Sequence, residues 1–401
     1  MSDAVQFLHL ADLHIGLRIT RFDESVAKKL REARLLALDN ALKIAREKNV
    51  AFILICGDLF DDNTISLVDA QRVYDMLKGK PMPVYVLPGN HDPYCAGSVW
   101  QRPPWGNTEG TSIRVLSKRE PVALEIGVTL YPCPVMQKTS REDPTEWISA
   151  NNGPQNTIRI GLAHGSVMDR ETLPEDDHPI PVDAAESLGL DYLALGHWHA
   201  QKLFQDSRGA NRMAYPGTHE QMNFGKGSGF SVGWAAYASD PDREEFRGSS
   251  KGTALLVQIQ SLGAVPIVQP VETGQYIWSD EALELTDENF DATFSQIAQR
   301  KNQERQLLRL TLAGTLSAEN RLKLEGFQDM LNRYLWHELD TDELGWNPTD
   351  EELEETVGHG VLGEVLRKIK GKLENEPTND ERLKIEKAIF VLYRLARELS
   401  P

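Results

Sequence analysis

The segment YVLPGNHDP, residues 85–93, is an apolar strand pattern that runs directly into an amide, an imidazole and a carboxylate. A parallel α/β sheet binds ligands just beyond the carboxyl ends of its strands. Four further segments repeat the design of an apolar run that ends in side chains typical of metal ligands: FLHLADLH (7–14), FILICGD (52–58), IRIGLAH (158–164) and YLALGHWH (192–199). Together the five strand ends predict a single site of chemistry.

The order of elements around these segments predicts an α/β fold. Apolar strand patterns at residues 5–13, 51–56 and 84–87 alternate with helical patterns at residues 24–48 and 66–78. Strands separated by helices in this way pair in parallel through right-handed crossovers. Shorter strand patterns continue along the chain, and we expect the first domain to span residues 1–262.

The chain has 401 residues, which is too long for one compact core of usual size. Residues 263–346 are expected to form a small α+β cap, with a strand at residues 308–312 followed by an amphipathic helix. Residues 347–401 are expected to be helical. An apolar stripe there suits either a helix folded back on its own domain or a partner-binding helix: Ile385, Ile389, Leu392, Ala396 and Leu399.

The charge of the chain argues against simple nucleic-acid binding. The net charge is -17, so the overall field repels a phosphate backbone. Bound cations would neutralise part of this charge, because some of the acids belong to the strand-end motifs. A local run of basic residues after the first motif suits either a solvated face or a phosphate-binding path: Arg18, Arg21, Lys28 and Lys29.

The sequence does not indicate a membrane or disulfide-rich protein. No apolar run approaches the roughly eighteen residues needed to span a bilayer, and the start, MSDAVQF, lacks the pattern of a signal peptide. The three cysteines form no C-x-x-C pair, which indicates neither a disulfide framework nor a thiolate zinc site. We therefore expect a soluble, cytoplasmic protein without a membrane partner.

The strand-end motifs supply oxygen and imidazole ligands without sulfur, a set suited to manganese, iron or zinc. A two-metal site needs one carboxylate between the ions. Asp58 is the only acid at its strand end, and we expect it to be this bridge. The full set of candidate metal ligands is Asp12, His14, Asp58, Asn90, His164, His197 and His199.

The motifs DLH, GDLFD, PGNHD, AHG and GHWH resemble those of the calcineurin-like metallophosphoesterase superfamily over roughly residues 5–220. DLHIG, GDLFD, YPGT and a distinct C-terminal cap are similar more narrowly to the SbcD/YhaO-type branch of DNA-repair exonucleases. The resemblance implies an α/β fold in which two sheets form an α/β/β/α sandwich, followed by the small α+β cap and C-terminal helices.

Carried over residue by residue, the resemblance implies two divalent metal ions, most simply Mn²⁺, with Fe²⁺ or Zn²⁺ as alternatives. His91 would face the scissile phosphate as a catalytic residue, and Asp92 would be its orienting partner. One metal would be held by Asp12, His14, Asp58 and His199, and the other by Asp58, Asn90, His164 and His197.

These features lead to the hypothesis of a two-metal phosphodiesterase that hydrolyses DNA. The resemblance further implies an SbcC-like ATPase partner docked on the cap or C-terminal helices, and a twofold homodimer. A phosphoesterase for small nucleotides or phosphoproteins is the alternative, because it would use the same metal core. A third interpretation is a binding subunit with a vestigial metal site. The complete set of candidate ligands argues against it.

One position departs from part of the branch. Asp61 stands three residues after Asp58, where archaeal and eukaryotic members carry a second histidine and bacterial-type members often carry aspartate. The direction of cleavage is therefore not transferred from the resemblance.

Three aromatic residues near the motifs have two interpretations each. Trp100 and Trp105 either stack on a substrate base or pack their own loop, and His219 either lines the groove or has a structural role. The acidic insertion at residues 229–252 fits no family motif.

Overall fold

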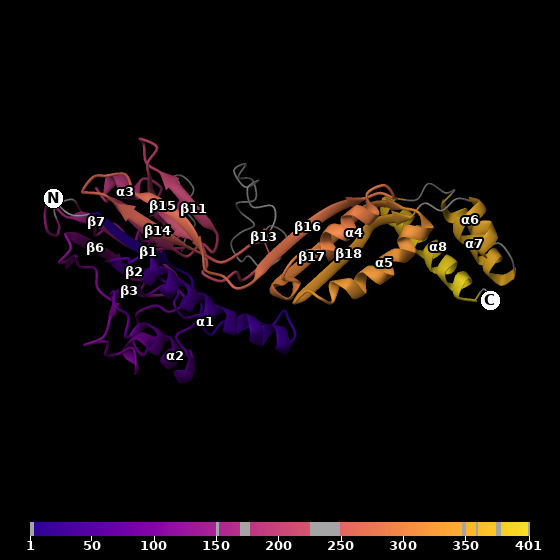
Figure 1. The fold of residues 1–401 in the computed structure, drawn as a ribbon. Coiled ribbons are helices and arrows are strands. Elements are labelled where there is room, and N and C mark those ends of the chain that lie inside the picture. The colour runs from indigo at the N-terminus through magenta and orange to yellow at the C-terminus, as the bar shows by residue number, and fades with distance from the viewer. Residues whose placement is uncertain are drawn as a thin grey trace. The chain divides into compact units, whose positions relative to one another are not determined.

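The computed structural model describes residues 4–149, 152–168, 177–224, 249–346, 350–357, 360–373 and 378–399. The chain forms two compact units. The first contains Met1–Met222 and Lys251–Tyr276, and the second contains Asn223–Ser250 and Ile277–Pro401. Figure 1 follows the elements of each unit along the chain.

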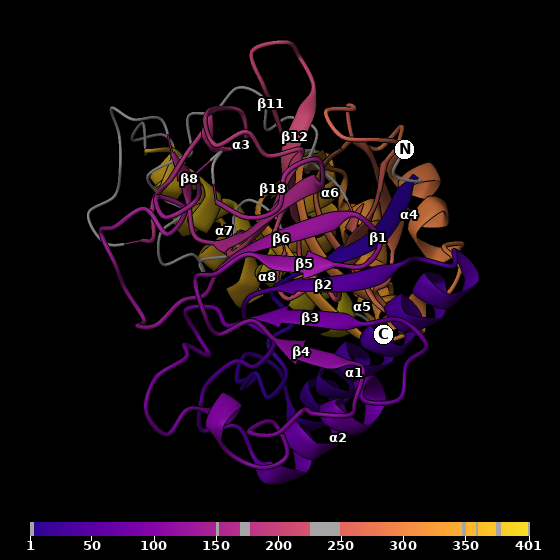
Figure 2. The same cartoon turned by 90° about the vertical axis from the view of Figure 1, so that its left-hand side faces the viewer.

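The first unit contains a six-stranded sheet in the order β15-β14-β1-β2-β3-β4. Its central strands, β1 to β4, pair in parallel, and β2, β3 and β4 follow one another in Figure 2. Strands β14 and β15 add an antiparallel edge beside β1. The strands are β1 (Val5–Leu10), β2 (Phe52–Cys56), β3 (Val84–Leu87), β4 (Ile113–Val115), β14 (Thr253–Ile259) and β15 (Ile267–Glu272).

A second six-stranded sheet has the order β11-β12-β10-β7-β6-β5. Its strands are β5 (Val122–Leu124), β6 (Val128–Cys133), β7 (Ile158–His164), β10 (Tyr192–Gly196), β11 (Gln201–Gln205) and β12 (Asn211–Pro216). The small pair β8 (Val167–Met168) and β9 (Ile180–Pro181) lies outside both large sheets.

Alternation along the strands explains how the two sheets stack. Successive side chains of a strand point to opposite faces, so Ile53 and Ile55 of β2 pack beneath α1 (Glu24–Glu47) and α2 (Leu67–Leu77). Phe52 and Leu54 point the other way and join one core with Leu130 and Ile160 of the second sheet. The outer face of that sheet packs on α3 (Ala184–Ser187). This layering confirms the predicted α/β/β/α sandwich.

The first unit continues past the predicted boundary at residue 262. Strand β15 lies in the segment assigned to the cap, but it pairs antiparallel with β14 in the first sheet. Val268 of β15 packs against the core between the two sheets. The first unit therefore extends to Tyr276, because the β14–β15 pairing continues its sheet.

The second unit contains a four-stranded sheet in the order β13-β16-β17-β18. Its last three strands are parallel, and α4 and α5 connect them as crossovers and pack on the sheet. The elements are β13 (Ser249–Ser250), β16 (Ile277–Leu285), α4 (Phe290–Ala298), β17 (Gln306–Leu316), α5 (Ala318–Leu331) and β18 (Trp336–Trp346). Short 3-10 helices lie at Val99–Gln101 in the first unit and at Gln303–Arg305 in the second.

Three further helices follow in the second unit: α6 (Asp350–Val357), α7 (Gly360–Leu373) and α8 (Asn379–Leu399). The apolar stripe of α8 is buried at Ile389, Leu392 and Ala396 against Leu353 of α6 and Leu366 of α7. The stripe therefore folds back on its own unit, which was one of its two interpretations. Every helix in the described part of the chain is too short or too polar to cross a lipid bilayer.

Candidate metal centre

The loops that follow β1 and β2 have unusual backbone geometry. Asp12, His14 and Asp58 have φ values of 55°, 44° and 52°, a left-handed region that residues other than glycine enter infrequently. Backbone hydrogen bonds from Asp12 N to Gly57 O and from His14 N to Asp58 O hold the two loops together. Such strained positions persist where the surrounding structure holds them, and they gather at functional sites.

Glycines of the motifs allow the candidate ligands to approach the backbone. A Cβ atom at Gly57 would collide with the ring of His164, and a Cβ atom at Gly89 would collide with the carboxylate of Asp58. Larger residues at these two positions would displace candidate ligands. This close approach explains why glycine precedes the polar residues in both the GD and PGN motifs.

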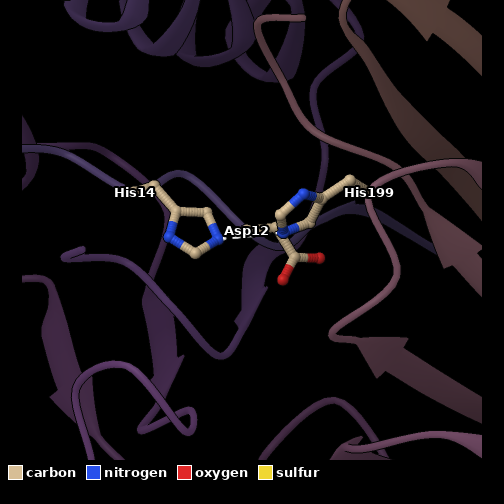
Figure 3. Close-up of side chains that lie close together, drawn as sticks. All are labelled: Asp12, His14 and His199. Atoms are coloured by element: carbon tan, nitrogen blue, oxygen red, sulfur yellow. Dashed lines mark hydrogen bonds between the residues drawn. The ribbon is translucent and has the colours of Figure 1, made fainter. Parts of the chain in front are cut away.

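The first group of candidate ligands is Asp12, His14 and His199, whose ligand atoms all lie within 4.8 Å of one another. Figure 3 shows the two imidazole rings turned toward each other with the Asp12 carboxylate beside them. The Nε2 atoms of His14 and His199 are 3.1 Å apart. Two nitrogens bound about 2.1 Å from one cation, at a right angle, would lie about 3 Å apart, so this pair fits a shared ion.

The second group converges on the side-chain oxygen of Asn90. That oxygen lies 2.8 Å from Nε2 of His164 and 3.2 Å from Nδ1 of His197. Asp58 lies between the groups, because its Oδ2 is 3.3 Å from Nε2 of His164 and 3.6 Å from Nε2 of His14. All seven candidate ligands are therefore brought together, and this set of oxygen and nitrogen donors fits a pair of divalent cations.

Burial and neighbouring charges together set the pKa values of the clustered side chains. Burial raises the pKa of Asp12 to about 7, and the neighbouring Asp58 adds to this effect. Burial also opposes ionisation of Asp58, but the adjacent His164 reverses the balance and lowers the pKa of Asp58. Burial opposes protonation of His164, yet Asp58 outweighs it and raises the pKa of His164. Buried carboxylates held this close together are an environment that cations would stabilise.

The site is closed on one side and open on the other. Asp12, His14, Asp58 and His164 are buried, whereas Asn90, His91, His197 and His199 are partly exposed. The partly exposed residues therefore define the side from which a substrate can approach.

His91 lies beside this open side of the cluster. Its backbone N–H donates to Oδ1 of Asp58 over 2.8 Å, and its ring centroid is 4.7 Å from that of His14. Nδ1 of His91 pairs with the backbone oxygen of Asp61 over 2.9 Å. This contact leaves Nε2 of His91 available to a substrate.

Asp92 does not orient His91 in the structure. Its two carboxylate oxygens accept hydrogen bonds from the backbone N–H groups of Gly89 and Phe60, at 2.7 Å and 2.9 Å. Burial, with the nearby Asp58, raises the pKa of Asp92 to about 8. The chain turns after Asn90, which directs Asp92 into the interior while the ring of His91 remains at the surface. The orienting contact of His91 comes from Asp61 instead.

Sequence reasoning missed two residues that contact the ligand loops. Arg34 of α1 is buried, and its Nε donates to the backbone oxygen of Leu13 over 2.7 Å. Asp177 contacts Nε2 of His197 over 2.9 Å. Arg34 follows a helical pattern and Asp177 stands in an irregular loop, so neither carried a motif that could have identified it.

The residues with two interpretations are structural in this fold. Trp100 and Trp105 are buried, and their rings pack against Phe60. His219 is buried, and its Nε2 donates to the backbone oxygen of Arg34 over 2.7 Å. Most of the acidic insertion, residues 229–248, lies outside the described residues.

Two stacked sheets with oxygen and imidazole ligands gathered at their strand ends define a metallophosphoesterase fold. Residues 5–201 match the family model of the calcineurin-like phosphoesterases. The chain belongs to the calcineurin-like phosphoesterase family through these residues.

Similar proteins support the narrower branch. The metallophosphoesterase YhaO of Bacillus subtilis is 25% identical over 54% of this chain and 53% of its own length. The DNA double-strand break repair protein Mre11 of Saccharolobus solfataricus is 30% identical over 50% of this chain and 51% of its own. Mre11 of Sulfurisphaera tokodaii is 30% identical over 50% of both chains. The chain therefore matches about half the length of these relatives.

Proposed function

We propose that this protein is a two-metal phosphodiesterase that hydrolyses DNA. The observation that carries the proposal is the position of Asp58 between two ligand groups, with His91 held beside them at the exposed side. The similarity to proteins named for DNA double-strand break repair supports DNA as the substrate. We propose Mn²⁺ as the metal, with Fe²⁺ and Zn²⁺ as alternatives that suit the same donors.

The ligands divide as the resemblance implies. Asp12, His14, Asp58 and His199 would hold one cation, and Asp58, Asn90, His164 and His197 would hold the other. Bound cations supply charge neutralisation for a phosphodiester and Lewis-acid activation of water.

The side chain of His91 faces the phosphate in this proposal. Its Nδ1–H donates to the backbone oxygen of Asp61, which fixes the ring and directs Nε2 outward. As an imidazolium, His91 would stabilise negative charge on the phosphoryl oxygens or protonate the leaving oxygen.

We further propose that an SbcC-like ATPase docks on the second unit and that the protein is a twofold homodimer. Helices α7 and α8 support the docking proposal, because they expose Val361, Val365, Val391 and Leu395 in a part of the chain that lacks metal ligands among its described residues. Exposed apolar side chains on neighbouring helices favour a protein partner.

The deciding experiment is manganese-dependent cleavage of end-labelled single- and double-stranded DNA, beside the generic diester bis(p-nitrophenyl) phosphate. The wild type is compared with Asp58→Asn and with Asp75→Asn, which removes the same charge from an exposed position on α2. We expect both DNA and the generic diester to be cleaved, and Asp58→Asn alone to abolish both activities. Undiminished cleavage by Asp58→Asn would exclude the two-metal mechanism.

A phosphoesterase for small nucleotides or phosphoproteins is the second candidate. The net charge of -17 favours it, because a strongly acidic protein repels a long polyanion. Turnover of the generic diester, with DNA intact even when an SbcC-like ATPase is added, would assign the site to a small substrate.

A further inference from the structure

The two ring nitrogens of His14 have different kinds of partner. Nε2 faces the ligand cluster, 3.1 Å from Nε2 of His199. Nδ1 lies on the other side of the ring, 3.1 Å from Oδ1 of Asp61. Because a carboxylate accepts and does not donate, this contact places the ring proton on Nδ1. The lone pair of Nε2 is then directed into the cluster.

His197 of the second ligand group also has one nitrogen facing the cluster and the other facing a carboxylate, but the roles of Nδ1 and Nε2 are the reverse of those in His14. Its Nδ1 faces the cluster, 3.2 Å from the side-chain oxygen of Asn90. Its Nε2 is 2.9 Å from Oδ1 of Asp177. The carboxylate of Asp177 therefore places the ring proton on Nε2 and directs the lone pair of Nδ1 inward.

Asp177 is itself held in position by contacts from neighbouring loops. Its Oδ2 accepts a hydrogen bond from the hydroxyl of Ser166, and its backbone oxygen accepts one from the N–H of Ser166 over 3.2 Å. The same hydroxyl accepts a hydrogen bond from Nε1 of Trp198, the residue that follows His197. Asp177 thus contacts His197 directly and is connected through Ser166 to the neighbouring Trp198.

His164 provides a comparison within the same cluster. Its outer nitrogen, Nδ1, lies 2.9 Å from the backbone oxygen of Cys56, whereas Nε2 faces Asn90. A backbone carbonyl fixes a ring tautomer without adding a negative charge. A carboxylate fixes the tautomer and also increases the basicity of the inward nitrogen.

We propose that Asp61 and Asp177 are positioning residues for two different cations, Asp61 through His14 and Asp177 through His197. The proposal rests on the two-metal site proposed above and assigns one outer carboxylate to each ligand group. It also gives a role to Asp61, the position at which this chain has aspartate instead of the second histidine of some relatives in the branch.

Asp61 contacts both His14 and His91, but its carboxylate is closer to His14. Oδ1 of Asp61 lies 3.1 Å from Nδ1 of His14 and 3.7 Å from Nδ1 of His91, and the hydrogen bond of His91 is to the backbone oxygen of Asp61, at 2.9 Å. An Asp61→Asn substitution keeps the backbone contact and removes the carboxylate charge. Because His14 is a proposed metal ligand and His91 is not, a change in metal binding would report on the contact with His14.

The experiment is a calorimetric titration of the full chain with MnCl₂ alone, in two backgrounds that each lack a ligand of one group. In Asn90→Ala, which weakens the second group, we expect Asp61→Asn to reduce Mn²⁺ affinity about 10- to 100-fold and Asp177→Asn to leave it unchanged. In His199→Ala, which weakens the first group, we expect the reverse. Asp75→Asn is the charge-matched control in both backgrounds.

This crossed pattern separates positioning from general destabilisation, which would weaken both groups together. Equal losses in both backgrounds, or no loss from either substitution, would overturn the proposal. The titration does not depend on DNA cleavage. If the cleavage experiment described above left DNA intact while the titration gave the crossed pattern, the proposed substrate would be refuted and the two carboxylate roles would be retained.

The tautomers can be measured in the unsubstituted protein, which removes any dependence on the folding of the variants. Two-bond ¹⁵N–¹H correlation spectra of histidine-labelled protein should show the proton of His14 on Nδ1 and that of His197 on Nε2. The opposite tautomer at either ring would overturn the role of its carboxylate.

Discussion

The two units of the chain bury different kinds of side chain. Among the described residues, the first unit buries many histidine, acidic and arginine side chains: His9, Asp12, His14, Arg34, Asp58, Asp92, His164, His178, Asp191, His219 and Glu220. In the described part of the second unit, the buried polar side chains are the uncharged Ser279, Gln303 and Gln306. Burying a charge has a high free-energy cost unless the group is paired or hydrogen-bonded. The difference indicates that the first unit accepts a lower folding stability in order to hold its ionisable side chains in place. The second unit is stabilised mainly by apolar packing.

The largest expected effect is a loss of catalytic rate in the first unit without a change in its fold. His91→Ala should reduce manganese-dependent cleavage of bis(p-nitrophenyl) phosphate about 100- to 1,000-fold, because the loss of one group that stabilises transition-state charge has effects of this size. The measurement is kcat, together with the number of Mn²⁺ ions bound, which should not change.

His337→Ala is the matched control, because it removes a histidine from β18 of the second unit. Full activity in His91→Ala would exclude His91 from the mechanism. Loss of bound metal would make it a ligand, contrary to the role proposed here.

A substitution in the second unit should have the opposite effect. Leu310 lies on β17 and is fully buried in the apolar core formed with α4 and α5. Leu310→Ala should lower the free energy of unfolding of this unit by about 2–5 kcal/mol, through lost burial and the cavity left behind. Hydrogen exchange resolved by segment is the measurement, and kcat on the generic diester should remain at the wild-type value.

Leu262→Ala is a suitable control because Leu262 is 47% exposed. If Leu310→Ala removed Mn²⁺ binding as well, the distinction between a chemical unit and a packing unit would fail.

The effect expected over the narrowest range of conditions concerns acid stability in the first unit. His9 is fully buried between Tyr192 and the backbone oxygen of Leu195, and burial lowers its pKa from 6.5 to about 3. Below about pH 6.5 the unfolded chain binds a proton at His9 that the folded chain rejects. The free energy of unfolding should therefore fall with pH, by roughly 3 kcal/mol from this residue between about pH 7 and about pH 4.

This contribution is measured as the difference in unfolding free energy between the wild type and His9→Asn, determined without metal at several pH values. The difference isolates His9 from other buried groups whose pKa values are raised, such as Asp92. His337→Asn should show a much weaker pH trend. A difference independent of pH would mean that His9 is not buried as a neutral ring.

Much of the first unit was predictable because its signals are local in the chain. An apolar run followed by Asp58 or His164 marks both a buried strand and the residue at its end, and parallel pairing brings such ends together. The second unit was less predictable, since its strands and helices carry no motif and β17 (Gln306–Leu316) is longer than the alternation at residues 308–312 indicated.

The sequence by itself determined which residue types stand at the strand ends, and with them the family and the candidate ligand set. Only the tertiary structure decided how those residues are supported. Asp177 reaches His197 across a loop, Asp92 turns to backbone amides, and β15 joins the first sheet. The physical reason is that periodicity depends on neighbours in the chain, whereas these contacts depend on strand pairing and packing between distant segments.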